Sequence, residues 1–208
     1  MKGLLLKDIY MLTKYCRAYL LIAIVFISVS LFSDDNLFFI FYPCLLCGMI
    51  PVNLLGYDER SRWLQYSETM PYTRAQIVNG KYLIGLLCQI SMLLITAIAQ
   101  AISMNIKGGF ILSEYTLTVS LVLVMSLVSS SISLPFMFKL GVEKGRMAYY
   151  IMVGVVCAGG VFLAKLLAKD SEIPVNLSNS LPFICIAAVS IYALSWYLSI
   201  IFYKKREL

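Results

Sequence analysis

The stretch GYDERSRWLQYSETMPYTRAQIVNGK, residues 56–81, is the longest polar interruption in an otherwise apolar sequence. Asp58 and Glu59 stand where a short helix could begin, because acidic side chains suit the positive end of the helix dipole. Trp63 and Tyr66 follow three residues apart, so a helix would place both rings on one face. This spacing predicts a short helix that lies outside the apolar segments of the chain.

The second half of the stretch predicts a turn and a new helix. Pro71 should end the short helix, since proline cannot continue one. Thr73 and Gln76 have the spacing of a capping box, and Tyr72 and Ile77 have the spacing of a hydrophobic staple. We therefore expect a second helix to begin at about Thr73 and to run into the apolar segment that follows.

The composition of the chain is that of a membrane protein. Of its 208 residues, 61% are hydrophobic and 13% are charged, and the mean hydropathy is +0.85. A soluble domain carries about 25% charged residues. Histidine is absent, which removes most acid–base and metal chemistry. Cys44 and Cys47 form a C-x-x-C without a second ligand pair, so we interpret them as small buried hydrophobic residues.

Six apolar segments are long enough to cross a bilayer as helices. Two prolines in the second segment, Pro43 and Pro51, each lack a backbone N–H and predict a kink near one of them. The sequence thus predicts one all-α transmembrane domain over residues 1–208. The expected spans are at about 16–33, 37–56, 82–104, 115–138, 148–167 and 181–203.

Positive charge is distributed unequally between the two sides of these spans. Fourteen of the 17 Lys and Arg residues fall on the side that holds the N-terminal segment, the loop 57–81 and the C-terminal tail. The positive-inside rule therefore predicts that this side is cytoplasmic and that both termini lie there. The net charge of +6 reflects topology, and nucleic-acid binding need not be invoked. The three exceptions are Lys107, Lys165 and Lys169.

The N-terminal segment, residues 1–14, has an amphipathic pattern. Lys7 and Lys14 share one face of a helix, which suits a helix that lies in the cytoplasmic interface. A simple extension of the first span is the alternative. Three apolar residues share the opposite face: Leu5, Ile9 and Leu12.

A polar stripe runs along the third span. Its residues fall within about 60° of one another at 100° per residue. They fit two interpretations, the wall of a hydrated substrate path or hydrogen bonds between packed helices, of which we favour the second. The stripe consists of Gln89, Thr96, Gln100 and Ser103.

Several kinds of chemistry are missing from the sequence. It contains no phosphate-binding G-x-x-x-x-G-K-[ST] motif, and without histidine no Ser/His or Cys/His pair can form. No acidic or basic residue lies at the centre of any expected span, whereas ion-coupled carriers usually need one. We therefore expect no catalytic residue, metal or cofactor in this chain, and any energy for transport should come from another chain.

The loop resembles that of bacterial ABC exporter permeases of the type 2 class. These permeases have an amphipathic N-terminus, six spans and a long cytoplasmic loop between the second and third. Met70 stands where leucine is usual in that class. The resemblance is carried by Asp58-Glu59-Arg60-Ser61-Arg62-Trp63, Tyr66, Thr69-Met70-Pro71-Tyr72-Thr73-Arg74, Ile77-Val78 and Lys81-Tyr82.

The resemblance implies a permease that works with separate ATPase subunits. The loop 57–81 would hold a coupling helix that docks on the ATPase, which binds ATP and Mg²⁺. Two permeases, identical or paralogous, and two ATPases would form the exporter in the bacterial cytoplasmic membrane. Small members export amphipathic peptides such as phenol-soluble modulins, or protect against bacteriocins. The expected docking residues are Asp58, Glu59, Arg60, Trp63 and Tyr66.

Other functions remain open at this point. The chain could be a stand-alone membrane immunity factor or an anchor protein that has no ATPase partner, and a channel is a further alternative. Trp63 and Tyr66 would then be ordinary aromatic residues of the membrane interface.

Overall fold

The computed structural model describes residues 2–15, 17–32, 36–67, 69–106, 109–147, 150–151 and 177–205, and every regular element in these ranges is a helix. The all-α prediction is therefore confirmed. The labelled helices are α1 (Lys2–Tyr15), α2 (Arg17–Phe32), α3 (Asn36–Gly48), α4 (Ile50–Arg60), α5 (Trp63–Ser67), α6 (Arg74–Ile106), α7 (Leu112–Leu140) and α9 (Leu177–Lys205).

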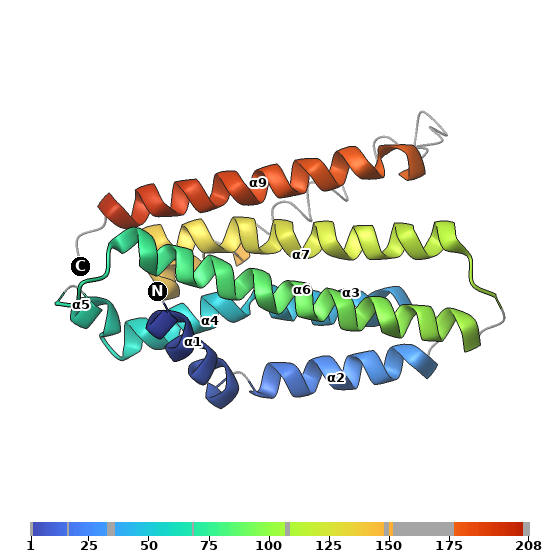
Figure 1. Cartoon of the computed structure of the whole chain (residues 1–208), viewed down its shortest axis with the longest axis horizontal. Coiled ribbons are helices and arrows are strands. Elements are labelled where there is room, and N and C mark those ends of the chain that lie inside the picture. Colours follow the sequence, from blue (N-terminus) through green and yellow to red (C-terminus); the bar gives the residue numbers. More distant parts are fainter. Residues whose placement is uncertain are drawn as a thin grey trace.

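The long helices form a bundle whose members run side by side (Figure 1). α6, α7 and α9 pack against one another, and α3 packs against α2, α6 and α7. α1 and α5 lie together at one end of the bundle, where α9 ends and α6 begins (Figure 1). At this end Arg74 Nη1 donates a hydrogen bond of 3.2 Å to the Lys204 carbonyl oxygen. The loop 57–81 and both described ends of the chain thus share one end of the molecule.

Four of the six predicted spans are present as helices long and apolar enough to cross a membrane. A fifth would be formed by α1 and α2 together, which are bent by 62° relative to each other. The predicted fifth span, 148–167, lies outside the described residues except at 150–151. The four spanning helices are Phe39–Arg60, Arg74–Ile106, Leu112–Leu140 and Leu181–Lys205.

The second span is interrupted, as its prolines predicted. α3 contains Pro43 and ends at Gly48. α4 begins at Ile50 with Pro51 in its first turn, a position where the missing N–H of proline costs no helical hydrogen bond. The interruption falls at Met49, between the two helices.

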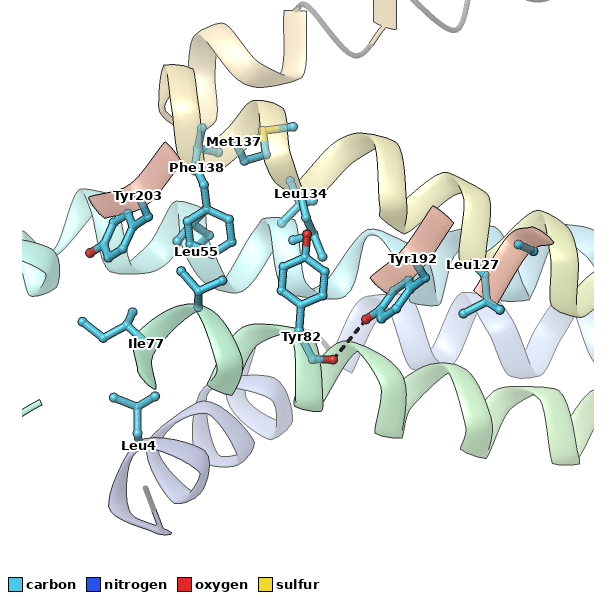
Figure 2. Close-up of a cluster of buried hydrophobic side chains, with 14 residues drawn as sticks. Leu4, Leu55, Ile77, Tyr82, Leu127, Leu134, Met137, Phe138, Tyr192 and Tyr203 are labelled. Atoms are coloured by element: carbon cyan, nitrogen blue, oxygen red, sulfur yellow. Dashed lines mark hydrogen bonds between the residues drawn. The ribbon is translucent and has the colours of Figure 1, made fainter. Parts of the chain in front are cut away.

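Tyr82 lies at the centre of the main apolar core (Figure 2). Its ring stacks on Trp196 at 5.3 Å and meets Tyr192 edge-on at 5.4 Å. Its hydroxyl hydrogen-bonds with Ser195 at 2.9 Å and with Ser199 at 2.7 Å. These contacts hold the beginning of α6 against α9, and so fix the helix that follows the loop.

Candidate functional site

The loop begins where α4 ends, which corrects one prediction. Asp58 and Glu59 belong to the last turn of α4 and do not begin a new helix. The first helix of the loop is α5, which starts at Trp63. Acidic side chains are unfavourable at the negative end of a helix dipole. Each of these two carboxylates therefore depends on a partner from another part of the chain.

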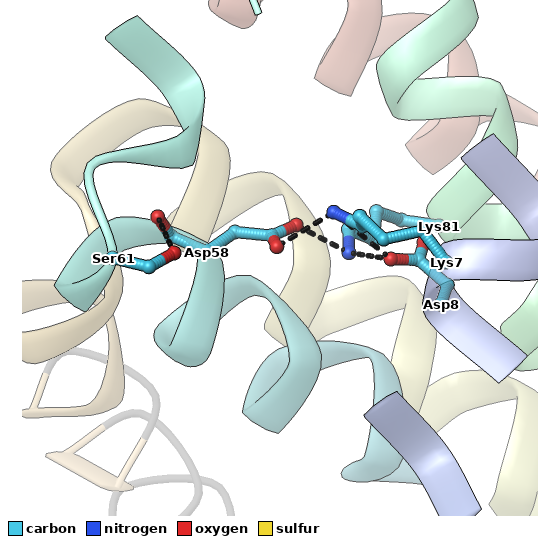
Figure 3. Close-up of polar contacts among 5 residues, drawn as sticks. All are labelled: Lys7, Asp8, Asp58, Ser61 and Lys81. Carbon is cyan, nitrogen blue, oxygen red and sulfur yellow. Dashed lines mark hydrogen bonds and ion pairs between the residues drawn. The ribbon is translucent and has the colours of Figure 1, made fainter. Parts of the chain in front are cut away.

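The partners of Asp58 come from α1 and α6 (Figure 3). Lys7 Nζ lies 2.7 Å from Asp58 Oδ1, and Lys81 Nζ lies 2.6 Å from Asp58 Oδ2. Lys81 Nζ also donates a hydrogen bond of 2.8 Å to Asp8 Oδ1, and Lys7 Nζ lies 3.2 Å from the same oxygen. We call Lys7, Asp8, Asp58 and Lys81 the ionic quartet.

The ionic quartet is buried and electrically balanced. Asp8, Asp58 and Lys81 are at most 1% exposed, while the Lys7 side chain is 23% exposed. Two positive and two negative charges cancel. A buried ion pair adds little net stability, but removing one partner leaves an uncompensated charge at a cost of about 3–5 kcal/mol. The quartet therefore specifies how α1, α4 and α6 are arranged. Since Asp58 precedes α5 and Lys81 follows it, both ends of the loop are fastened to α1.

Trp63 and Tyr66 share one face of α5, as predicted. Their ring centroids are 5.7 Å apart. The Trp63 ring is half-buried, and Lys7 Nζ lies over it at 4.3 Å from the centroid. Tyr66 is 56% exposed. Of the two rings, that of Tyr66 is the more exposed.

Glu59 and Arg60 lie beside the segment that follows α7. Glu59 Oε2 accepts a hydrogen bond of 2.7 Å from the Val142 backbone N–H, at the beginning of the helical residues 142–147. Arg60 is exposed and lines a polar cleft of about 560 Å³ together with Tyr57 and Lys144. The end of α4 is thus joined to a second segment at the same end of the bundle.

The capping box at the other end of the loop is present. The Thr73 backbone N–H donates to Gln76 Oε1 at 3.0 Å, and the Gln76 backbone N–H donates to Thr73 Oγ1 at 3.3 Å. Tyr72 packs against the core cluster that contains Ile77. α6 begins within one residue of the predicted position.

The polar stripe of α6 faces the interior of the bundle, and all four of its residues are buried. Gln89 Nε2 donates to the Ser126 carbonyl oxygen at 3.0 Å and to Ser130 Oγ, both on α7. Thr96 Oγ1 lies 3.7 Å from Cys44 Sγ on α3. These contacts favour helix packing for Gln89 and Thr96. Gln100 Oε1 is buried and finds no hydrogen-bond partner among the residues that the structure describes.

Comparison with protein families decides the identity of the chain. The model of the family described as ABC-2 family transporter protein matches residues 3–204. The chain belongs to the ABC-2 transporter family. Comparisons with curated proteins and with solved structures gave no match. ABC-2 members are membrane components of transporters, so the resemblance seen in the loop is confirmed at the level of the family.

The ABC-2 chain also has features that sequence reasoning missed. Asp8 was not singled out, and Lys7 was assigned to a polar face of an interfacial helix, where its ammonium group would meet water. In the structure Lys7 is turned into the ionic quartet, while Leu5 and Leu12 pack against a core cluster. The only sequence signal was an acidic residue within an otherwise basic and apolar N-terminal segment.

Proposed function

We propose that this ABC-2 protein is the membrane-spanning permease subunit of an ATP-driven exporter, with α5 as the coupling helix on which a separate ATPase subunit docks. The observation that carries the proposal is the family match over residues 3–204, combined with the position of α5 at one end of the bundle (Figure 1). A helix so placed is accessible to a partner outside the membrane.

The docking residues divide into two groups by their surroundings. Arg60 and Tyr66 are exposed and are the candidates for direct contact with the ATPase. Asp58, Glu59 and Trp63 are held by partners within the chain, so we assign them mainly to holding α5 in place. This division refines the expectation that all five residues meet the partner.

The distribution of charge supports an external energy source. The described spans carry no acidic or basic residue over 18–32, 36–57, 82–106, 115–138 and 177–203. The ionic quartet joins α1 to the last turn of α4 and to the early part of α6, so it lies near the ends of these two spans and not halfway along them. Coupling to an ion gradient usually needs an ionisable group within the membrane. ATP and Mg²⁺ would therefore be bound by the partner ATPase, with none needed in this chain.

The remaining parts of the proposal rest on the resemblance and on the charge asymmetry. The substrate would be amphipathic or hydrophobic, such as a peptide toxin, a bacteriocin or a drug, and it would move out of the cell. Two permeases, identical or paralogous, would assemble with two ATPases in the bacterial cytoplasmic membrane. The excess of Lys and Arg on the side of the loop favours cytoplasmic termini.

Copurification tests the proposal against a stand-alone immunity or anchor protein. We expect a P-loop ATPase encoded beside this chain to copurify with it, and mass analysis of the complex to give two copies of each subunit. ATP hydrolysis by the complex should respond to the transported compound. A permease that purifies without the coexpressed ATPase, in a membrane-like detergent and at low salt, would favour the stand-alone protein.

A further inference from the structure

Lys7 connects α1 to both sides of the joint between α4 and α5. Its ammonium nitrogen lies 2.7 Å from Asp58 Oδ1, before the joint, and 4.3 Å from the centroid of the Trp63 ring, after it. An ammonium group over the face of a tryptophan is attracted by the negative charge of the ring face. One side chain of α1 therefore contacts the end of α4 and the beginning of α5 at once.

The joint itself is short and bent. It consists of Ser61 and Arg62, and Arg62 has φ 53, a left-handed conformation that non-glycine residues rarely adopt. Backbone hydrogen bonds link it to both helices: the Ser61 N–H donates to the Tyr57 oxygen at 3.0 Å, the Arg62 N–H to the Glu59 oxygen at 3.2 Å and the Tyr66 N–H to the Arg62 oxygen at 3.2 Å. α5 has only five residues, too few to fix its orientation relative to α4 by its own interactions. Contacts made from outside the joint must therefore set the angle of α5.

We propose that Lys7 is a positioning residue that sets the orientation of α5, which makes α1 a structural part of the docking unit. The inference deepens the proposed function and rests on it where docking is concerned. The orientation of α5 is a property of this chain alone, so it can be measured without any partner. The affinity of a partner that binds α5 would then depend on the position of α1 as well.

The chemistry of the contact decides which variants are informative. Lys7→Met removes both the ion pair and the cation–π contact and leaves two carboxylates with Lys81. The double variant Lys7→Met/Asp58→Asn leaves Asp8 and Lys81 as a balanced pair, so the buried charge remains compensated. Lys7→Arg keeps a positive charge that can pair with Asp58 and lie over the Trp63 ring. Lys14→Met is the matched control, because Lys14 is exposed on the same helix and its ammonium group lies over the neighbouring Tyr15 ring.

The test measures the distance between α1 and α5 in the full-length chain. Spin labels are attached to cysteines at Tyr10 and Tyr66, both exposed, in a background in which the six native cysteines are replaced. We expect Lys7→Met/Asp58→Asn to broaden the distance distribution, whereas Lys14→Met and Lys7→Arg should leave it narrow. A narrow distribution in the double variant, equal to that of the parent, would overturn the inference.

A second readout separates this inference from the proposed function. If α5 receives the ATPase, Lys7→Met/Asp58→Asn should weaken ATPase binding about fivefold, because the variant removes the cation–π contact to Trp63 and the two ion pairs of Asp58 that together hold α5 in its orientation. A broadened distribution with unchanged ATPase affinity would support the positioning role of Lys7 and contradict docking on α5. A narrow distribution with weakened binding would overturn the positioning role and leave the docking proposal standing.

Discussion

Asp8 and Lys81 show how two residues far apart in the sequence become one structural unit. Each is almost completely inaccessible to water, and they are 73 residues apart. Neither could be buried alone, because an ion without a partner in a region of low dielectric constant loses far more hydration energy than packing returns.

A double-mutant cycle on this pair tests the coupling. Asp8→Asn and Lys81→Met should each lower the free energy of unfolding by about 3–5 kcal/mol, since each leaves one uncompensated charge in the ionic quartet. The double variant leaves Lys7 and Asp58 as a balanced pair. Its loss of unfolding free energy should therefore be smaller than the sum of the two single-variant losses, by about 0.5–3 kcal/mol. Unfolding of the purified protein in detergent measures this, with Lys14→Met as the exposed control. If the losses of the two single variants add up to that of the double variant, Asp8 and Lys81 are not energetically coupled, which would contradict the role of the ionic quartet.

Two glutamines of the polar stripe on α6, Gln89 and Gln100, differ in their hydrogen bonds in a way that the sequence could not predict. Gln89→Leu removes hydrogen bonds to α7 and should cost about 1 kcal/mol, as for other hydrogen bonds between membrane helices. Gln100→Leu removes a buried oxygen that has no partner among the described residues, and should leave stability unchanged or raise it. Paired melting and transport measurements would check both. Loss of transport in a stable Gln100→Leu protein would support the substrate-path interpretation at that position.

At the scale of elements, the beginning of α6 depends on local interactions. Thr73→Ala should cost about 1 kcal/mol, the usual value for an N-cap hydroxyl, and should increase hydrogen exchange in the first turn of α6. Ser91→Ala is the control, because Ser91 is exposed on the same helix and its hydroxyl donates to the Cys88 carbonyl oxygen within that helix. Equal exchange in both variants would show that the capping box does not hold this end.

The features that the sequence predicts correctly depend on local contacts, and those that it does not predict depend on contacts between residues far apart in the chain. The helix beginning at Thr73, the shared face of Trp63 and Tyr66 and the interruption between Pro43 and Pro51 depend on residues a few positions apart. The predicted second span ends at residue 56, four residues before the end of α4 at Arg60, because the polar side chains after residue 56 indicate a loop. Those side chains are compensated by Lys7, Lys81 and the Val142 N–H, and no local pattern reveals such partners.

At the scale of the whole molecule, the orientation in the membrane is a prediction from charge alone. Single cysteines at Thr69 and Ser113 test it, since both positions are exposed, and the first lies before the beginning of α6 while the second lies after its end. An impermeant maleimide should label position 113 in intact cells and position 69 only after permeabilisation. Ser67 is unsuitable as a probe because it is buried. Labelling of position 69 in intact cells would invert the topology and remove the docking proposal.

The affinity of the purified permease for its ATPase tests the central claim most directly. Tyr66 is the most exposed aromatic ring of the loop 57–81, and aromatic anchors dominate many protein interfaces. Tyr66→Ala should therefore weaken binding about thirtyfold, or about 2 kcal/mol. Tyr197→Ala, which removes a comparably exposed tyrosine from α9, should bind like the parent. If Tyr66→Ala also binds like the parent and ATP hydrolysis stays coupled to transport, α5 is not the coupling helix.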